Sequence, residues 1–260
     1  MNTPLPRAKK HLGQHFLVDP HYIARIVAAI RPETDDLMVE IGPGPGALTH
    51  PLAGVLHHLH VVEFDRDMVA RLQAEFPAER LTIHQADALA FDFGALGGGL
   101  RVVGNLPYNI SSPLLFHLAE YATDIRDMVF MLQKEVVDRM AAAPDTPDYG
   151  RLSVMLQARF AVTRLFIVPP GAFRPPPKVD SAIVRLLPLP AEAVPYTHHK
   201  TFAEVVARAF GQRRKTLRNT LKGLVDDATF AAVGIDPARR GETLSVAEFA
   251  ALANRLHAAG

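Results

Sequence analysis

The chain of 260 residues contains no cysteine, which excludes disulfide bonds, thiolate catalysis and cysteine-ligated metal sites. It also has no apolar run long enough to cross a bilayer, and its N-terminal stretch lacks the hydrophobic region of a secretion signal. We therefore predict a cytoplasmic protein without membrane contact or a metal centre. The length is sufficient for one large domain and one small domain.

The low net charge of +1 hides an uneven distribution. Residues 31–100 contain eleven acidic and four basic side chains, whereas residues 198–222 contain seven basic side chains and one acidic one, Glu204. A basic C-terminal segment on an acidic body favours a polyanionic partner held through that segment. The alternative is a solvated helix face without a ligand.

Strands and helices alternate along most of the chain. Apolar runs predict strands near 37–41, 59–63, 81–83, 100–103, 128–132, 163–168 and 179–187, and periodic segments predict helices near 20–30, 65–76, 113–119, 134–140 and 151–160. This order is typical of a doubly wound, mainly parallel α/β sheet, with the last two strands as an antiparallel pair at one edge. The rest is predicted to be helical, over 199–209, 213–221 and 246–257. We place the domain boundary near residue 190, which gives domains of residues 1–190 and 191–260.

A glycine turn follows the first buried strand of the predicted sheet. The residues Gly42-Pro43-Gly44-Pro45-Gly46 separate that strand from the next helix. Glycine permits the sharp turn and lets a ligand approach the backbone, while the helix start directs free N–H groups to the same place. The turn predicts a nucleotide-like cofactor near Gly42 and Gly44, or else only a tight connection between a strand and a helix.

Acidic residues close the second and third strands. Glu63 follows the glycine turn by about twenty positions, where a carboxylate can accept both hydroxyls of a ribose. Asp87 can accept the amino group of an adenine. Ligands of doubly wound sheets lie at these strand ends, although either carboxylate alone could be an exposed loop acid. Glu63 does not distinguish a nicotinamide cofactor from S-adenosylmethionine.

The fourth strand leads to Asn105-Leu106-Pro107-Tyr108. An exocyclic amine is a poor nucleophile because its lone pair is delocalised into the ring, and two acceptors on its hydrogens favour the reactive pyramidal nitrogen. The Asn105 amide oxygen and a backbone carbonyl could supply those acceptors, and the Tyr108 ring could stack on the base. The alternative is an ordinary asparagine-proline turn.

At this point the sequence resembles a known family, the S-adenosylmethionine-dependent dimethyltransferases of small-subunit ribosomal RNA adenines. The resemblance covers nearly the whole chain through LGQHFLVD (12–19), EIGPGPGALT (40–49), VEFD (62–65), ADAL (86–89), GNLPYNISSPLL (104–115), QKEVVDRM (133–140), YGRLSVMLQ (149–157), FRPPPKVDSAIVRL (173–186) and AFGQRRKTLRNTL (209–221). It implies a seven-stranded class I methyltransferase fold with a small helical C-terminal domain.

The resemblance also implies roles for matching residues. An N-terminal lid, residues 1–18, would cover the cofactor S-adenosylmethionine, which would be bound by His15, Leu17, Gly42, Glu63, Asp87 and Asn105. Asn105 and the Pro107 carbonyl would hold the adenine amine, while Tyr108 and Phe173 would sandwich the flipped base. The chain departs from the family at His15, where asparagine is common.

The substrate implied is a pair of adjacent adenines in a hairpin loop near the 3′ end of small-subunit ribosomal RNA, each methylated twice. RNA contacts are expected from Arg213, Arg214, Lys215, Arg218 and Lys222, with Arg208, Leu217 and Leu221 on the interior face of the helices. We expect a monomer. The alternatives are a large-subunit methyltransferase of the macrolide-resistance type, a non-catalytic ribosome-assembly factor, and a nicotinamide oxidoreductase, for which no convincing catalytic constellation is found.

Overall fold

The computed structural model describes residues 6, 8–9 and 14–258. Part of the predicted lid, residues 1–5, 7 and 10–13, lies outside these residues. The chain divides into two compact units, residues 1–137 with 163–188, and residues 138–162 with 189–260. The segment 138–162 therefore groups with the C-terminal helices rather than with the sheet.

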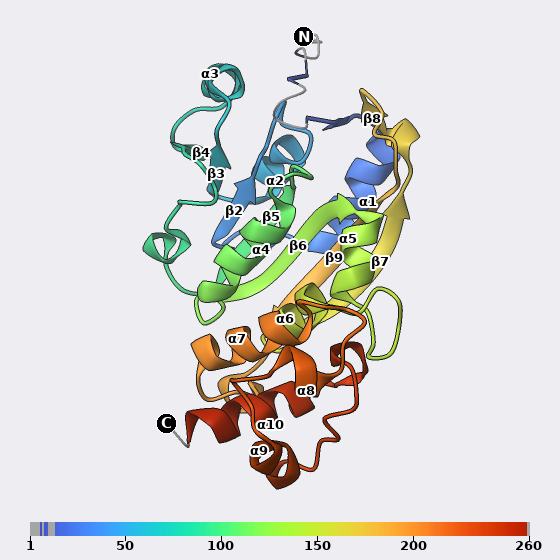
Figure 1. Ribbon diagram of the computed structural model, residues 1–260. Helices are drawn as coiled ribbons and strands as arrows, with labels where there is room; N and C mark the ends of the chain where they lie inside the picture. The colour runs from blue at the N-terminus through green and yellow to red at the C-terminus, as the bar shows by residue number, and fades with distance from the viewer. Residues whose placement is uncertain (1–5, 7, 10–13, 259–260) are drawn as a thin grey trace. The chain divides into compact units, whose positions relative to one another are not determined.

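The first unit contains a seven-stranded sheet of order β4-β3-β2-β5-β6-β9-β7 (Figure 1). Its strands are β2 (Met38–Ile41), β3 (Leu59–Glu63), β4 (Leu81–Gln85), β5 (Leu100–Asn105), β6 (Ile125–Gln133), β7 (Phe160–Val168) and β9 (Ser181–Pro188). Strands β4, β3, β2, β5 and β6 pair in parallel, and β9 pairs antiparallel with β6. The predicted doubly wound, mainly parallel fold is confirmed.

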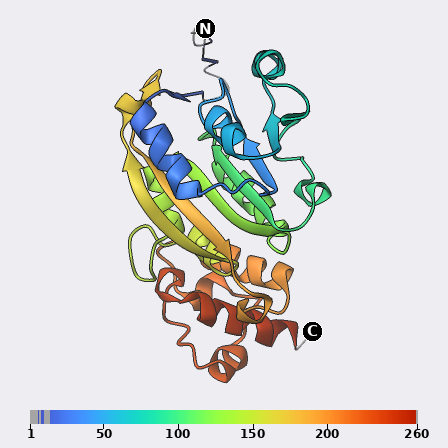
Figure 2. The same cartoon turned by 180° about the vertical axis from the view of Figure 1, so that it is seen from behind.

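The helices of this unit connect successive strands and cover both faces of the sheet. They are α1 (Pro20–Ile30), α2 (Thr49–Val55), α3 (Arg66–Glu75) and α4 (Ser111–Glu120), with α5 (Lys134–Met140) beginning in this unit. Helix α4 lies in front of the sheet in Figure 1, and α1 lies in front of it in the reverse view of Figure 2. Asp19 caps α1 by accepting from the backbone N–H of His21, and Pro20 occupies the first turn.

A second, two-stranded sheet was not predicted from the sequence. It pairs β1 (Phe16–Leu17) antiparallel with β8 (Phe173–Arg174), so that Leu17 lies opposite Phe173. Both of these side chains belong to the hydrophobic core, together with Ile26 and Ile30 of α1. The β1 segment is thereby fixed to the first unit.

The second unit is mainly helical. It contains α6 (Arg151–Gln157), α7 (His199–Ala209), α8 (Leu217–Thr220), α9 (Asp227–Ala232) and α10 (Val246–His257). Helices α7 and α10 match the predicted bounds, but the predicted helix 213–221 is wrong in length because residues 211–215 form turns and α8 begins only after Thr216. Leu217 and Leu221 are buried as predicted. Arg208 is not, because it lies exposed and pairs with Glu204 at 2.8 Å.

Candidate active site

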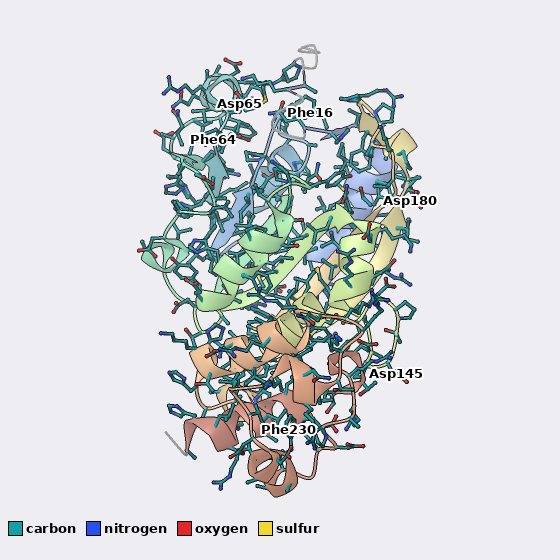
Figure 3. All side chains as sticks on the ribbon, viewed as in Figure 1. Phe16, Phe64, Asp65, Asp145, Asp180 and Phe230 are labelled. Carbon is teal, nitrogen blue, oxygen red and sulfur yellow. The ribbon has the colours of Figure 1, made fainter. Side chains whose placement is uncertain are left out.

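A cavity of about 250 Å³ lies at the carboxyl ends of β2, β3, β4 and β5. Nine predicted site residues line it, namely His15, Leu17, Gly42, Gly44, Glu63, Asp87, Asn105, Pro107 and Tyr108. Figure 3 labels two further lining residues, Phe16 and Phe64, at this end of the sheet. The strand-end positions predicted from the sequence therefore converge on one site.

The glycine turn forms one wall of the cavity. Gly42 and Gly44 have φ values of 65° and 53°, in the left-handed region that favours glycine. A Cβ on Gly42 would lie 3.7 Å from the backbone oxygen of Asn105, and one on Gly44 would contact the Phe16 ring at 3.5 Å. Side chains here would fill the space between the turn and its neighbours, so the glycines keep the backbone accessible to a ligand.

Glu63 is held in place by the backbone around it. Its Oε1 accepts from the Asp65 N–H at 2.8 Å, and its Oε2 accepts from the Gly44 N–H at 3.2 Å. Burial raises the pKa of this carboxyl, while these two hydrogen bonds act in the opposite direction. Each oxygen keeps a further lone pair, which suits acceptance of two neighbouring hydroxyl groups.

Asp87 lies beside the end of β4. Its Oδ1 accepts from the backbone N–H of Leu89 at 2.9 Å, which fixes the loop. The side chain also borders a second, contiguous depression with Phe64 and Ala86, two residues that line the main cavity as well. Asp87 can therefore face the ring end of a nucleoside whose ribose lies at Glu63.

Asn105 ends β5, and its amide group has a defined orientation. Its Nδ2 donates to the backbone oxygen of His15 at 3.1 Å, which leaves the acceptor Oδ1 available for a ligand. The preceding residue must be small, because a Cβ on Gly104 would lie 2.4 Å from the carbonyl oxygen of Ile41. The two features place an amide oxygen at the cavity.

Pro107 and Tyr108 continue the same turn. The Pro107 carbonyl accepts one hydrogen bond from the Ile110 N–H at 3.2 Å, so one lone pair remains for another donor. The Tyr108 hydroxyl is hydrogen-bonded to the Ser181 hydroxyl at 2.7 Å, which anchors the edge of its ring. Burial raises the pKa of Tyr108, so the ring is neutral and serves as a flat surface rather than as a base.

Phe173 is not brought together with these residues. Its side chain is 0% exposed, belongs to the hydrophobic core and does not line the cavity. In this conformation the ring facing Tyr108 is that of His15, with ring centroids 5.7 Å apart and an interplanar angle of 25°. A stacking role for Phe173 would require its ring to leave the core.

Sequence reasoning missed Glu40, a buried carboxyl group in β2 that also lines the cavity. Its Oε2 accepts from the Thr49 hydroxyl at 2.6 Å. Burial and the neighbouring charge of Glu63 raise the pKa of Glu40 to about 8. The available signal was an acidic residue inside an otherwise apolar strand, directly before the glycine turn.

Comparison with known proteins gives a consistent result. Residues 6–258 match the family model described as ribosomal RNA adenine dimethylase. The chain is 62% identical over 252 residues to the ribosomal RNA small subunit methyltransferase A of Aromatoleum aromaticum, covering 97% of this chain and 95% of that one. The protein of the same name from Laribacter hongkongensis is 61% identical and covers 95% of each.

Two solved structures share the fold over nearly the full length. A dimethyladenosine transferase from Plasmodium falciparum has a TM-score of 0.78 at 26% identity, covering 92% of this chain and 96% of that chain. The 23S rRNA methyltransferase ErmE has a TM-score of 0.70 at 26% identity, covering 93% and 99%. With the family match and the cavity at the strand ends, these similarities lead to one assignment: the chain belongs to the ribosomal RNA adenine dimethylase family.

Proposed function

We propose that this protein transfers methyl groups from S-adenosylmethionine to N6 of two adjacent adenines near the 3′ end of small-subunit ribosomal RNA. The adenines lie in a hairpin loop, and each is methylated twice during assembly of the subunit. The observation that carries the proposal is the orientation of Asn105, whose amide oxygen is left free at the cavity by the bond from its nitrogen to His15.

The residues of the cavity suit the cofactor. Glu63 would accept the ribose hydroxyls, Asp87 the adenine amine, and the open backbone at Gly42 and Gly44 would contact the methionine portion. His15 and Leu17 would cover it from the N-terminal side. S-adenosylmethionine supplies an activated methyl group on a positively charged sulfur.

The adenine amine would be held by two acceptors at the end of β5. The Asn105 amide oxygen and the remaining lone pair of the Pro107 carbonyl would accept its two hydrogens, which favours a pyramidal nitrogen as positive charge develops. The fixed ring of Tyr108 would support the flipped base by stacking. A dedicated base is not needed, because the proton can leave after the methyl group has been transferred.

We assign catalysis to residues 1–190 and RNA contact to residues 191–260, the helical C-terminal domain. All five predicted contact residues are exposed: Arg213, Arg214, Lys215, Arg218 and Lys222. Arg218 pairs with Asp227 at 3.1 Å, and Arg213 donates to the Pro147 carbonyl at 2.5 Å. Among the described residues the other three form no ion pair, which leaves them available for phosphates. We expect the protein to act as a monomer in the cytoplasm, where its ribosomal substrate is assembled.

A large-subunit target is less well supported. The structural similarity to ErmE concerns the shared fold, whereas the curated relatives at 55–62% identity carry the small-subunit name. A non-catalytic assembly factor would have no need for the aligned Asn105, Pro107 and Tyr108. The small-subunit reaction therefore accounts for more of the site.

The test uses small ribosomal subunits that lack the modification, with large subunits as the matched control. Purified protein and S-adenosylmethionine labelled in the methyl group are added to each, and the RNA is digested to nucleosides. We expect dimethyladenosine, at two positions, from small subunits alone. Label in large subunits instead, or label in another nucleoside, would contradict the proposal.

A further inference from the structure

The imidazole ring of His15 covers one face of Tyr108. The ring centroids are 5.7 Å apart and the planes differ by 25°, which is a stacked arrangement. Stacked aromatic pairs have centroids about 4.5–7 Å apart, so a base between two rings would require roughly twice the lower separation. No base fits between His15 and Tyr108 as they stand.

The His15 ring is held there by a directed hydrogen bond. Its Nδ1 lies 2.8 Å from the backbone oxygen of Pro175. A carbonyl oxygen can only accept, so Nδ1 must carry the hydrogen and the ring orientation is defined. The backbone oxygen of the same residue accepts from Asn105 at 3.1 Å. His15 thus contacts Tyr108, Pro175 and Asn105 at once.

The partners of His15 are themselves immobilised. The Tyr108 hydroxyl is bonded to Ser181 at 2.7 Å, so the tyrosine ring cannot simply swing away. The neighbouring residue Phe16 is buried and, with Leu17, forms the strand that pairs with β8. The His15 side chain, which is only partly buried, is therefore the group that can move when a ligand approaches Tyr108.

We propose that the imidazole of His15 occupies the place of the target adenine on Tyr108, so that an entering base must displace it. The inference rests on the proposed function, because it concerns the same base. In the absence of RNA the contact keeps the Tyr108 face covered. It acts as a competitor, and free adenine nucleotides bind this face only weakly because each must first break the histidine stack and the bond to Pro175.

The test measures binding of adenosine 5′-monophosphate, which carries the base and its amine without the ribosomal RNA. S-adenosylhomocysteine is added at saturation for each variant, so that the cofactor cavity is filled. We expect His15→Ala and His15→Asn to bind the nucleotide about tenfold more tightly than the wild type, because one ring contact and one hydrogen bond no longer have to be broken.

The control variant is His21→Ala, which removes an exposed histidine that meets Tyr22 edge-on at 5.3 Å. It should leave nucleotide affinity unchanged. Tyr108→Ala should abolish the gain when combined with His15→Ala, since the gain depends on the uncovered ring. Unchanged or weaker binding by both His15 variants would overturn the proposal and make the histidine a supporting wall of the base site.

A second readout needs no variant that could fail to fold. In the wild-type protein, the ring-proton resonances of His15 carry a ring-current shift from Tyr108, and the nucleotide should remove that shift. Persistence of the shift at saturating nucleotide would contradict displacement. Because neither measurement involves methyl transfer, failure here leaves the ribosomal assay informative, and failure of that assay leaves these two results standing.

Discussion

The Thr49 hydroxyl donates to the Glu40 carboxyl at 2.6 Å, and both side chains are buried beneath the glycine turn. A carboxyl group with this environment is strongly disfavoured as an anion, because burial removes its solvation and Glu63 adds a like charge. The pKa of Glu40 rises to about 8, so at neutral pH the folded protein holds a proton that an unfolded chain would release.

The first prediction concerns the pH dependence of stability. The Glu40 pKa is 4.5 in the unfolded reference and about 8 in the folded protein. Its favourable contribution to the free energy of unfolding is thus complete below pH 4.5 and is lost as pH rises to 8. Glu40→Gln, which cannot ionise, should lose less stability over this range. Urea unfolding at pH 5, 7 and 8.5 measures the difference, and parallel profiles for the two proteins would contradict it.

A second prediction separates the two aromatic residues assigned to the base. Phe173→Ala should lower the free energy of unfolding by about 3–5 kcal/mol, because the lost ring is fully buried. Tyr108→Ala should instead weaken RNA binding, by about 1–3 kcal/mol of stacking. Phe64→Ala is the stability control, since its side chain is 63% exposed, and it should change unfolding by less than about 0.5 kcal/mol. A stable Phe173→Ala protein with weakened RNA binding would support stacking by Phe173.

Phe173 also shows where sequence reasoning reaches its limit. The motif FRPPPK identifies the family, but a phenylalanine in a turn can face either a ligand or the core, and the pairing of Leu17 with Phe173 decides this. The strands concerned have only two residues each, too few for a periodic pattern. Contacts between residues so distant along the chain cannot be inferred from local sequence.

The strand ends were predictable for the opposite reason. Glu63 and Asn105 each follow an apolar run, and a parallel sheet brings the ends of such runs to one edge. In the helical domain, residues 213–221 were predicted as one helix because their composition is favourable. The chain instead starts the helix after the extended residue Thr216, so local propensity alone gave the wrong length.

The third prediction concerns the cofactor. Glu63→Ala should weaken binding of S-adenosylmethionine by about 1.5–3 kcal/mol, because charge-assisted hydrogen bonds to the ribose are lost. Calorimetry with the purified variant measures this directly. Lys134→Ala, which alters a charge at the start of α5 and outside the cavity lining, should not change affinity. Equal affinity of Glu63→Ala and wild type, combined with lost turnover, would reassign Glu63 from binding to chemistry.

The fourth prediction concerns the basic segment. Replacing Arg214, Lys215 and Lys222 with glutamine should weaken binding to small subunits and reduce the slope of log affinity against log salt by about 2 to 3, at roughly 0.7–0.9 per lost phosphate contact. Arg208→Gln is the matched control, because this arginine is already paired with Glu204. Cofactor affinity should be unaffected in both. An unaltered slope in the triple variant would show that the segment is only a solvated surface.

The central claim is that the Asn105 amide oxygen accepts a hydrogen of the reacting amine. The direct measurement is single-turnover methyl transfer to unmodified small subunits by Asn105→Ala, with S-adenosylmethionine affinity determined on the same preparation. The account predicts a rate lower by about a hundred- to a thousandfold, equivalent to roughly 2.7–4 kcal/mol of lost transition-state stabilisation, at nearly unchanged cofactor affinity. Methyl transfer close to the wild-type rate would contradict it.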